Sequence, residues 1–153
     1  MHRWRRGDGD GGGDVLSGEV QQFFERYRDA FNRLDGNAVA DLWHSASGIA
    51  DCRGNSARIT WWPDDASMRS NHLALCAVYR NNGYGRAEFQ VIDCIDLGVH
   101  HAFANLQWLL WRADGGLLQA FRTGYQLMRT ADGPKVVLAT AYEEVPMPVP
   151  PNA

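Results

Sequence analysis

The chain has 153 residues and a formal net charge of −3 at pH 7, with 45% hydrophobic and 11% aromatic residues. A chain of this length fits one domain that buries an apolar core without disulfides. The mild negative charge argues against a nucleic-acid partner, since phosphate binding needs a basic face. No apolar run reaches the roughly 18 residues of a membrane helix, so no membrane partner is expected.

The chain carries three cysteines, Cys52, Cys76 and Cys94, with no CxxC spacing. We expect small buried thiols in a reducing cytoplasm, which makes the predicted location cytoplasmic.

Both ends of the chain differ in composition from the middle. Residues 1–14 are rich in glycine and aspartate and lack the apolar stretch of a secretory signal, so they are predicted to be a flexible leader. Residues 146–153 hold four prolines and cannot extend a sheet. One domain is therefore expected over residues 15–145.

Three helices are predicted in the first half of the chain. Apolar residues recur at steps of three and four over Glu19–Leu34, with Ser17 as its N-cap. Asn37 is expected to cap a short second helix that turns Val39, Leu42 and Trp43 inward. Asp64 or Asp65 is expected to cap a third helix that ends near Asn81 and whose inner stripe is Met68, His72, Leu75, Cys76 and Tyr79.

The remaining segments read as strands. A short hairpin is predicted from Ile49–Cys52 and Ala57–Trp62, joined by a polar turn. Four long runs follow from Arg86 to Glu144, and the Asp-Gly pairs at 114–115 and 132–133 mark tight reversals between antiparallel strands. Such long strands twist and curl. The predicted class is therefore α+β, with three N-terminal helices on the concave face of a curved antiparallel sheet and a cone-shaped pocket between them.

A turn centred on Asp114-Gly115 sets the register of the sheet. It pairs Arg112 with Leu117, Leu110 with Gln119, Trp108 with Phe121, Leu106 with Thr123 and Ala104 with Tyr125. Alternation then assigns one set of side chains to the concave face: His100, Ala102, Ala104, Leu106, Trp108, Leu110, Phe121, Thr123, Tyr125, Leu127, Leu138, Thr140 and Tyr142. The convex face carries Phe103, Leu109 and Trp111 among the polar Asn105, Gln107, Arg122 and Gln126, a mixed patch that predicts a homodimer through this face.

The order of the elements resembles the nuclear transport factor 2-like superfamily, which includes SnoaL-like polyketide cyclases, ketosteroid isomerases and scytalone dehydratases. The resemblance rests on FFERYRDAFNRLDGNAVADLWH, SGIAD and the closing FRTGYQLMRTADGPKVVLATAYEE, and it covers roughly Val15 to Glu144. It implies a pocket for a small hydrophobic molecule between helices and sheet. Fold alone does not settle function, because many members of the superfamily are not catalytic.

The resemblance also suggests residue roles. With Trp43 on the aromatic that ends the second helix of ketosteroid isomerases, Tyr27 falls on the oxyanion tyrosine and Asp51 on the general base. The third isomerase residue, a protonated acid, would fall near Ala104 or Asn105, and neither is an acid. The complete isomerase set is therefore absent.

The catalytic candidates are Asp51, Tyr27, His44 and His100. Asp51 lies between apolar residues and suits a base that removes a proton next to a carbonyl, or it is a surface turn residue. Tyr27 lies on the apolar stripe of its helix, either as an oxyanion donor or as a hydrogen-bonded core tyrosine. His44 and His100 are candidate auxiliary acids.

The candidate ligand-binding residues are mostly aromatic and would form flat walls for an aromatic or polycyclic ligand: Trp43, Trp61, His72, Trp108, Phe121 and Tyr125. The alternative is that these aromatic residues belong to the core, and the position of His72 on an apolar helical stripe is more typical of a core histidine. His100 and His101 point to opposite faces of a strand and cannot share one metal, and no metal motif occurs elsewhere, so neither a metal nor a cofactor is expected.

Two functions stay open. One is a cofactor-free isomerase, cyclase or dehydratase that transfers a proton on a small hydrophobic carbonyl compound. The other is a non-catalytic dimeric domain that binds a small molecule or a protein through the same cone.

Overall fold

The computed structural model describes residues 11–145 and has three helices and six strands. The predicted α+β class is confirmed. The first ten residues of the predicted leader and the proline-rich tail lie outside the described residues. In chain order the elements are α1 (Gly11–Asn32), α2 (Gly36–Ala40), β1 (Trp43–Arg53), β2 (Ser56–Trp62), α3 (Asp65–Asn81), β3 (Tyr84–Asp96), β4 (His101–Arg112), β5 (Leu117–Thr130) and β6 (Gly133–Val145).

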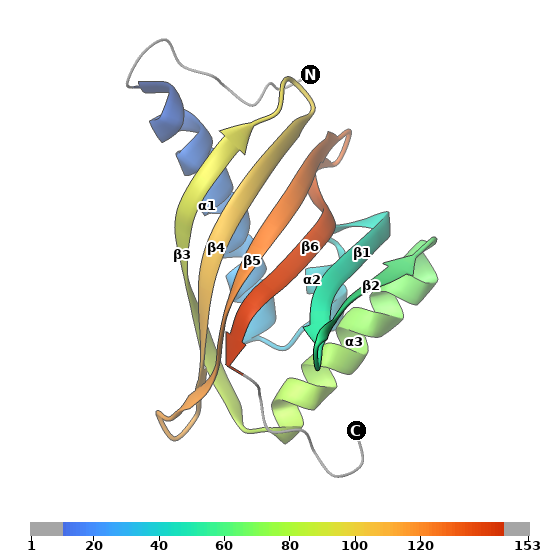
Figure 1. Cartoon of the computed structure of the whole chain (residues 1–153), viewed down its shortest axis with the longest axis vertical. Coiled ribbons are helices and arrows are strands. Elements are labelled where there is room, and N and C mark those ends of the chain that lie inside the picture. Colours follow the sequence, from blue (N-terminus) through green and yellow to red (C-terminus); the bar gives the residue numbers. More distant parts are fainter. Residues whose placement is uncertain (1–10, 146–153) are drawn as a thin grey trace.

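All six strands form one sheet in the order β2-β1-β6-β5-β4-β3. The four long strands β3 to β6 make the predicted antiparallel meander, and β1 and β2 make the predicted hairpin. The hairpin joins the meander through a parallel pairing of β1 with β6. In Figure 1 the sheet is strongly curved, and the helices lie against one of its faces.

The start of α1 and the N-cap of α2 differ from the predictions, and the N-cap of α3 agrees. α1 begins at Gly11, so Ser17 lies inside the helix and cannot cap it, and Gly11–Asp14 belongs to α1 rather than to a leader. The cap of α2 is Asp35, not Asn37, because the Asp35 carboxylate accepts the Ala38 N–H at 3.0 Å. Asp64 caps α3 as predicted and accepts the Ser67 N–H at 2.8 Å.

The junction between α1 and α2 is tight. Leu34, two residues after the end of α1, has a φ of 51°, and the Asp35 N–H donates to the Ala30 carbonyl at 3.1 Å, which satisfies one of the last carbonyl groups of the helix. Gly36 follows and lies directly against α3. A Cβ added there would lie 2.8 Å from the Leu73 Cα, so only glycine lets the two helices approach this closely.

The register between β4 and β5 is as predicted over most of its length, with Leu110, Trp108, Leu106 and Ala104 opposite their expected partners. The predicted pairing of Arg112 with Leu117 is wrong. The Gly115 N–H donates to the Arg112 carbonyl at 3.0 Å, so the turn lies one residue earlier, and Trp111 pairs with Leu117. A bulge after Leu110 compensates for the shift and restores the register.

The predicted face of β6 is wrong by one residue. The turn pairs Thr130 with Gly133, and a bulge between Gln126 and Leu127 then shifts the pairing of β6 with β5 by one residue. Tyr125 therefore faces Ala139, so Ala139 and Ala141 lie on the concave face. The predicted concave residues of this strand, Leu138, Thr140 and Tyr142, lie on the convex side, where the Tyr142 hydroxyl donates to Asn105 at 2.5 Å.

The core lies between α1 and the concave face. Val20, Phe23 and Phe24 on α1 are fully buried, and the Phe24 ring contacts Tyr125 of β5 with ring centroids 4.6 Å apart. Burying a phenylalanine side chain stabilises a fold by about 1.5–3 kcal/mol. These rings fix α1 over β5 and thereby also position the other side chains of α1 that face the sheet.

Two other expectations bear on the fold. Of the helices in residues 11–145, none is long and apolar enough to cross a membrane. The cysteines are free, but only Cys76 is buried; Cys94 is half-buried, and Cys52 is exposed because it lies next to the β1–β2 turn at the edge of the sheet.

Candidate functional site

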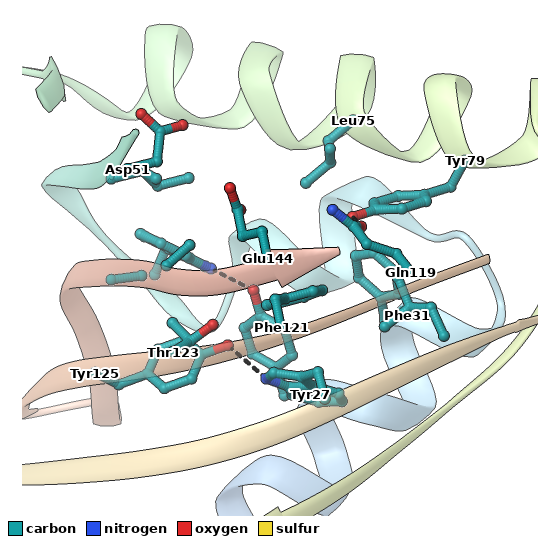
Figure 2. Close-up of a pocket in the computed structure, with 16 residues that line it drawn as sticks. Tyr27, Phe31, Asp51, Leu75, Tyr79, Gln119, Phe121, Thr123, Tyr125 and Glu144 are labelled. Atoms are coloured by element: carbon teal, nitrogen blue, oxygen red, sulfur yellow. Dashed lines mark hydrogen bonds between the residues drawn. The ribbon is translucent and has the colours of Figure 1, made fainter. Parts of the chain in front are cut away.

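A pocket of about 260 Å³ lies between α1, α3 and the concave face of the sheet (Figure 2). Ligand sites for drug-sized molecules have about 300–1,000 Å³, so this pocket fits a small ligand. Aromatic and aliphatic side chains dominate the lining, which consists of Tyr27, Phe31, Trp43, Ile49, Asp51, Leu75, Tyr79, Trp108, Leu110, Gln119, Phe121, Thr123, Tyr125, Ala139, Ala141 and Glu144.

Tyr27 reaches the pocket from the buried stripe of α1. Its hydroxyl oxygen accepts a hydrogen bond from the Trp43 indole N–H at 3.2 Å. Burial raises the pKa of the Tyr27 phenol well above its usual value, so the hydroxyl stays protonated. Within residues 11–145 no protein group accepts that proton, and Tyr27 can therefore donate to a ligand.

Tyr125 has the same arrangement one strand away. The Trp108 indole N–H donates to the Tyr125 hydroxyl at 2.8 Å, and burial raises the pKa of this phenol as well. Thr123, two residues earlier on the same face of β5, is buried, and its hydroxyl lies close enough to the Tyr125 hydroxyl to lower the pKa of that phenol, although it forms no hydrogen bond of regular geometry in the described part of the chain. A buried hydroxyl without a regular hydrogen bond costs free energy, which a ligand with a polar atom at this place would recover.

The third tyrosine of the pocket has a different role. Tyr79 of α3 donates its hydroxyl to the Gln119 side-chain carbonyl at 2.7 Å, across the space between helix and sheet. Its proton is therefore already used. The pair ties α3 to β5 and closes one end of the pocket.

Asp51 lines the pocket from β1, but its carboxylate is paired. Arg58, its partner residue on β2, donates from Nε to one carboxylate oxygen at 3.0 Å and from a terminal nitrogen to the other at 2.8 Å. The Asp51 side chain is 21% exposed and that of Arg58 44%. Arg58 thus occupies one acceptor site on each oxygen of the Asp51 carboxylate through charge-assisted hydrogen bonds.

Glu144 is a second pocket carboxylate. Phe121 of β5 lies opposite both Glu143 and Glu144, because β6 contains a bulge between its pairings at Tyr142 and Val145. Glu143 adopts a φ of 49°, which is uncommon for a residue with a side chain, and its carboxylate reaches Arg122 outside the pocket at 3.4 Å. Glu144 turns into the pocket instead.

The surroundings of Glu144 disfavour its charged form. Partial burial raises the pKa of the Glu144 carboxyl above its usual value, the negative charge of Asp51 raises it further, and Arg58 opposes both. Figure 2 shows Glu144 extending from the end of β6 toward α3, with Asp51 to one side and Tyr79 to the other.

Six of the ten predicted site residues line the pocket, namely Tyr27, Trp43, Asp51, Trp108, Phe121 and Tyr125. The other four do not. His44 lies within β1, which begins at Trp43 rather than at the predicted Ile49 because it pairs with β6, and its ring accepts the Ala46 N–H at 3.1 Å. His100 is exposed in the loop before β4. It was predicted to lie on the concave face of this strand, but the strand begins one residue later, at His101.

The two remaining predictions for ligand binding also fall outside the pocket. Trp61 lies across Gly48 on the other side of the sheet and is 51% exposed. His72 is 1% exposed and packs beneath Trp43 and Trp62, with ring centroids 4.6 Å and 6.4 Å away. His72 is thus a core histidine, the alternative reading of its position on α3.

Some lining residues that were not named as candidates could have been predicted from sequence patterns, and others could not. Gln119 follows from alternation, since it lies two residues before Phe121 on the same face. Phe31 and Tyr79 belong to apolar helical stripes that face the sheet. Glu144 could not be found reliably, because no sequence pattern predicts a bulge at a glutamate with positive φ.

The charge of the lining restricts the chemistry of the site. Among residues 11–145 it contains two carboxylates and no lysine, arginine or histidine, although Arg58 borders it through Asp51. Within residues 11–145 no three His, Cys, Asp or Glu side chains gather as a metal site. The arrangement can donate hydrogen bonds from Tyr27, Thr123 and Tyr125 and accept a proton at a carboxylate.

Comparison with solved structures places the chain in a broad group of similar folds. A domain of unknown function with a cystatin-like fold from Nostoc punctiforme has a TM-score of 0.65 at 12% identity, covering 85% of this chain and 78% of that one. A ketosteroid isomerase-like protein from Erwinia carotovora atroseptica has a TM-score of 0.59 at 16% identity, covering 84% and 95%. An NTF-2 like protein of unknown function from Shewanella oneidensis has a TM-score of 0.60 at 13% identity, covering 82% and 97%.

At such identities these structures establish the fold alone. No curated protein matches the chain. The match to a protein-family model is more specific, since it extends over residues 18–144, from within α1 to the pocket end of β6. The chain therefore belongs to the family described as NTF2-like protein (DUF6841).

Proposed function

We propose that this domain binds a small apolar molecule with a polar acceptor, such as an aromatic carbonyl compound, and transfers a proton on it without a cofactor. The observation that carries the proposal is the pairing of each inner tyrosine with a tryptophan. The indole N–H groups of Trp43 and Trp108 donate to Tyr27 and Tyr125, so each phenol oxygen has already accepted a bond and keeps its own proton for the pocket. The Thr123 hydroxyl beside Tyr125 adds a third polar group.

The surrounding lining supports the same ligand class. Aromatic rings and aliphatic side chains form the walls, which favours an apolar body, and none of the described lining residues is basic, which disfavours an anionic one. A carbonyl oxygen near the hydroxyls would accept a hydrogen bond that strengthens as negative charge develops on it.

Binding of acetophenone and ethylbenzene tests the proposal, because the two molecules have nearly the same shape and only acetophenone has an acceptor. Tryptophan fluorescence can follow binding, as Trp43 and Trp108 line the pocket. We expect acetophenone to bind more tightly to the wild type, and Tyr27→Phe to reduce that preference by about two- to tenfold, the value of one hydrogen bond. Tyr84→Phe is the matched control, since its hydroxyl bonds Asn32 outside the pocket. Absence of binding, or equal preference in wild type and Tyr27→Phe, contradicts the proposal.

A non-catalytic domain is the second candidate, and the pairing of Asp51 with Arg58 favours it. A catalytic base at Asp51 would need a free carboxylate oxygen, whereas Arg58 engages both. Native mass spectrometry of protein purified from its own cells distinguishes the two by identifying any retained ligand and whether the protein alters it on incubation.

A further inference from the structure

Of the two pocket carboxylates, only Asp51 is engaged by an arginine. Within residues 11–145 the Glu144 carboxylate forms no hydrogen bond or ion pair, while the acids beside it, Asp51 and Glu143, are paired with Arg58 and Arg122. A carboxylate with both oxygens free can meet a substrate proton directly.

The bulge in β6 is what brings Glu144 to this position. In regular β-strand alternation the residue after Ala141 that shares its face is Glu143, and Glu144 would point out of the pocket. The positive φ of Glu143 reverses this order, sending Glu143 to Arg122 and Glu144 into the pocket. Strained residues of this kind concentrate at functional sites, because the surrounding structure has to hold them.

The remaining geometry fits a carboxylate that works at the mouth of an apolar chamber. Glu144 is exposed on the solvent side, so a proton can leave to water, and its carboxyl lines the same pocket as the hydroxyls of Tyr27 and Thr123. Partial burial and the charge of Asp51 raise its pKa, which brings a carboxyl closer to the value of an efficient general base at neutral pH.

We infer that Glu144, turned inward by the bulge at Glu143, is the group that takes a proton from a neutral aromatic substrate in this pocket, and that Asp51 and Arg58 form a positioning pair beside it. This inference rests on the proposed function. It assigns the base to a residue at the end of the last strand rather than to Asp51.

The ring opening of 5-nitrobenzisoxazole provides a test that needs no knowledge of the natural substrate. A Glu144 oxygen takes the proton from C3, the electrons of the C–H bond form the nitrile, and the ring N–O bond breaks to leave 2-cyano-4-nitrophenolate, which is coloured. The tyrosine and threonine hydroxyls can donate to the phenolate oxygen as its charge develops. The non-reacting analogue 5-nitroindazole has a similar bicyclic shape and reports binding alone.

We expect the wild type to bind 5-nitroindazole and to open 5-nitrobenzisoxazole faster as the pH rises through the pKa of Glu144. Glu144→Gln should keep binding within about threefold but lose turnover at least a hundredfold, within the range for removal of a general base. Glu144→Asp should retain part of the turnover. Asp51→Asn should lose less than tenfold, and Glu143→Gln, the same chemical change one residue away, should behave like the wild type.

The outcomes separate this inference from the proposed function. Turnover that survives in Glu144→Gln, or that depends more on Asp51 than on Glu144, overturns the inference while ligand binding stands. A wild type that binds 5-nitroindazole but does not open 5-nitrobenzisoxazole also overturns the inference while ligand binding stands. If neither the nitroindazole nor acetophenone binds, the proposed function fails and the inference fails with it.

Discussion

His72 should make the stability of the domain depend on pH between about 4 and 6.5. Its two ring nitrogens are buried and have no hydrogen-bonding partner in the described part of the chain. Burial, together with a smaller effect of the positive charge of Arg69 on the same helix, lowers the pKa of the imidazole from 6.5 to about 4. The other contacts of the ring, Trp43 and Trp62, are uncharged.

The size of the effect follows from linkage. Below pH 6.5 the unfolded chain binds a proton at this histidine and the folded chain does not, so the free energy of unfolding falls as the pH is lowered. A pKa difference of this size corresponds to a loss of about 3 kcal/mol on going from neutral pH to pH 4. Above pH 6.5 the histidine is neutral in both states and contributes no pH dependence.

Urea denaturation of the wild type and His72→Leu at several pH values measures the effect. The variant removes the titrating ring and both unpartnered nitrogens, so we expect equal or higher stability at pH 7 and a flatter curve below pH 6.5. Carboxylates also titrate at low pH, but they do so in both proteins, and the difference between the curves isolates His72. His101→Leu, at an exposed position on β4, is the control. Parallel curves for wild type and His72→Leu would refute the reasoning.

Four further predictions concern single positions. Gly36→Ala should destabilise the fold by about 1–3 kcal/mol in thermal melts, because the new Cβ meets the Leu73 backbone. The control Gly18→Ala, whose new Cβ meets nothing within 4 Å, should be neutral or stabilising. Equal effects of the two substitutions would contradict this account. Asp51→Asn should cost only about 0.2–1 kcal/mol at pH 7, the range for a partly exposed ion pair with Arg58, and a larger loss would mean a structural role that excludes Asp51 from catalysis. Glu144→Gln should leave the melting temperature at pH 7 unchanged or higher. In the wild type the raised pKa of Glu144 makes the fold lose stability as the pH rises toward that pKa, and the variant should lack this loss. A clear drop in the melting temperature would show that the charge of Glu144 stabilises the fold. The half-buried apolar side chains of the convex face predict a homodimer, so Trp111→Glu should shift sedimentation toward monomer without loss of helix, and a monomeric wild type at micromolar concentration argues against it.

The parts of the fold that the sequence predicted depend on local signals. The Asp64 cap and the apolar stripe of α3 lie within a few turns of each other, and the pairing of Ala104 with Tyr125 follows from alternation on both sides of one hairpin. Each of these signals involves neighbours in the chain, and each was read correctly.

The errors arose where distant pairing or an inserted residue decides the geometry. β1 begins at Trp43 because it pairs with β6 more than ninety residues later, which no local pattern indicates. The bulge after Gln126 reversed the predicted faces of β6. The bulge at Glu143 brought an unpredicted carboxylate into the candidate site, and the Arg58 partner of Asp51 became visible only once the register of the β1–β2 hairpin was known.

The position of β6 in the middle of the sheet has a consequence for synthesis of the protein. β6 is the last of the described strands to leave the ribosome, yet it lies between β1 and β5 and is hydrogen-bonded to both. Until it is made, β1 and β5 each present one unpaired edge in addition to the outer edges of β2 and β3, and unpaired edges favour pairing between different chains. A chain truncated before Gly133 would therefore be prone to aggregate, and the sheet can be completed only after nearly the whole domain has been translated.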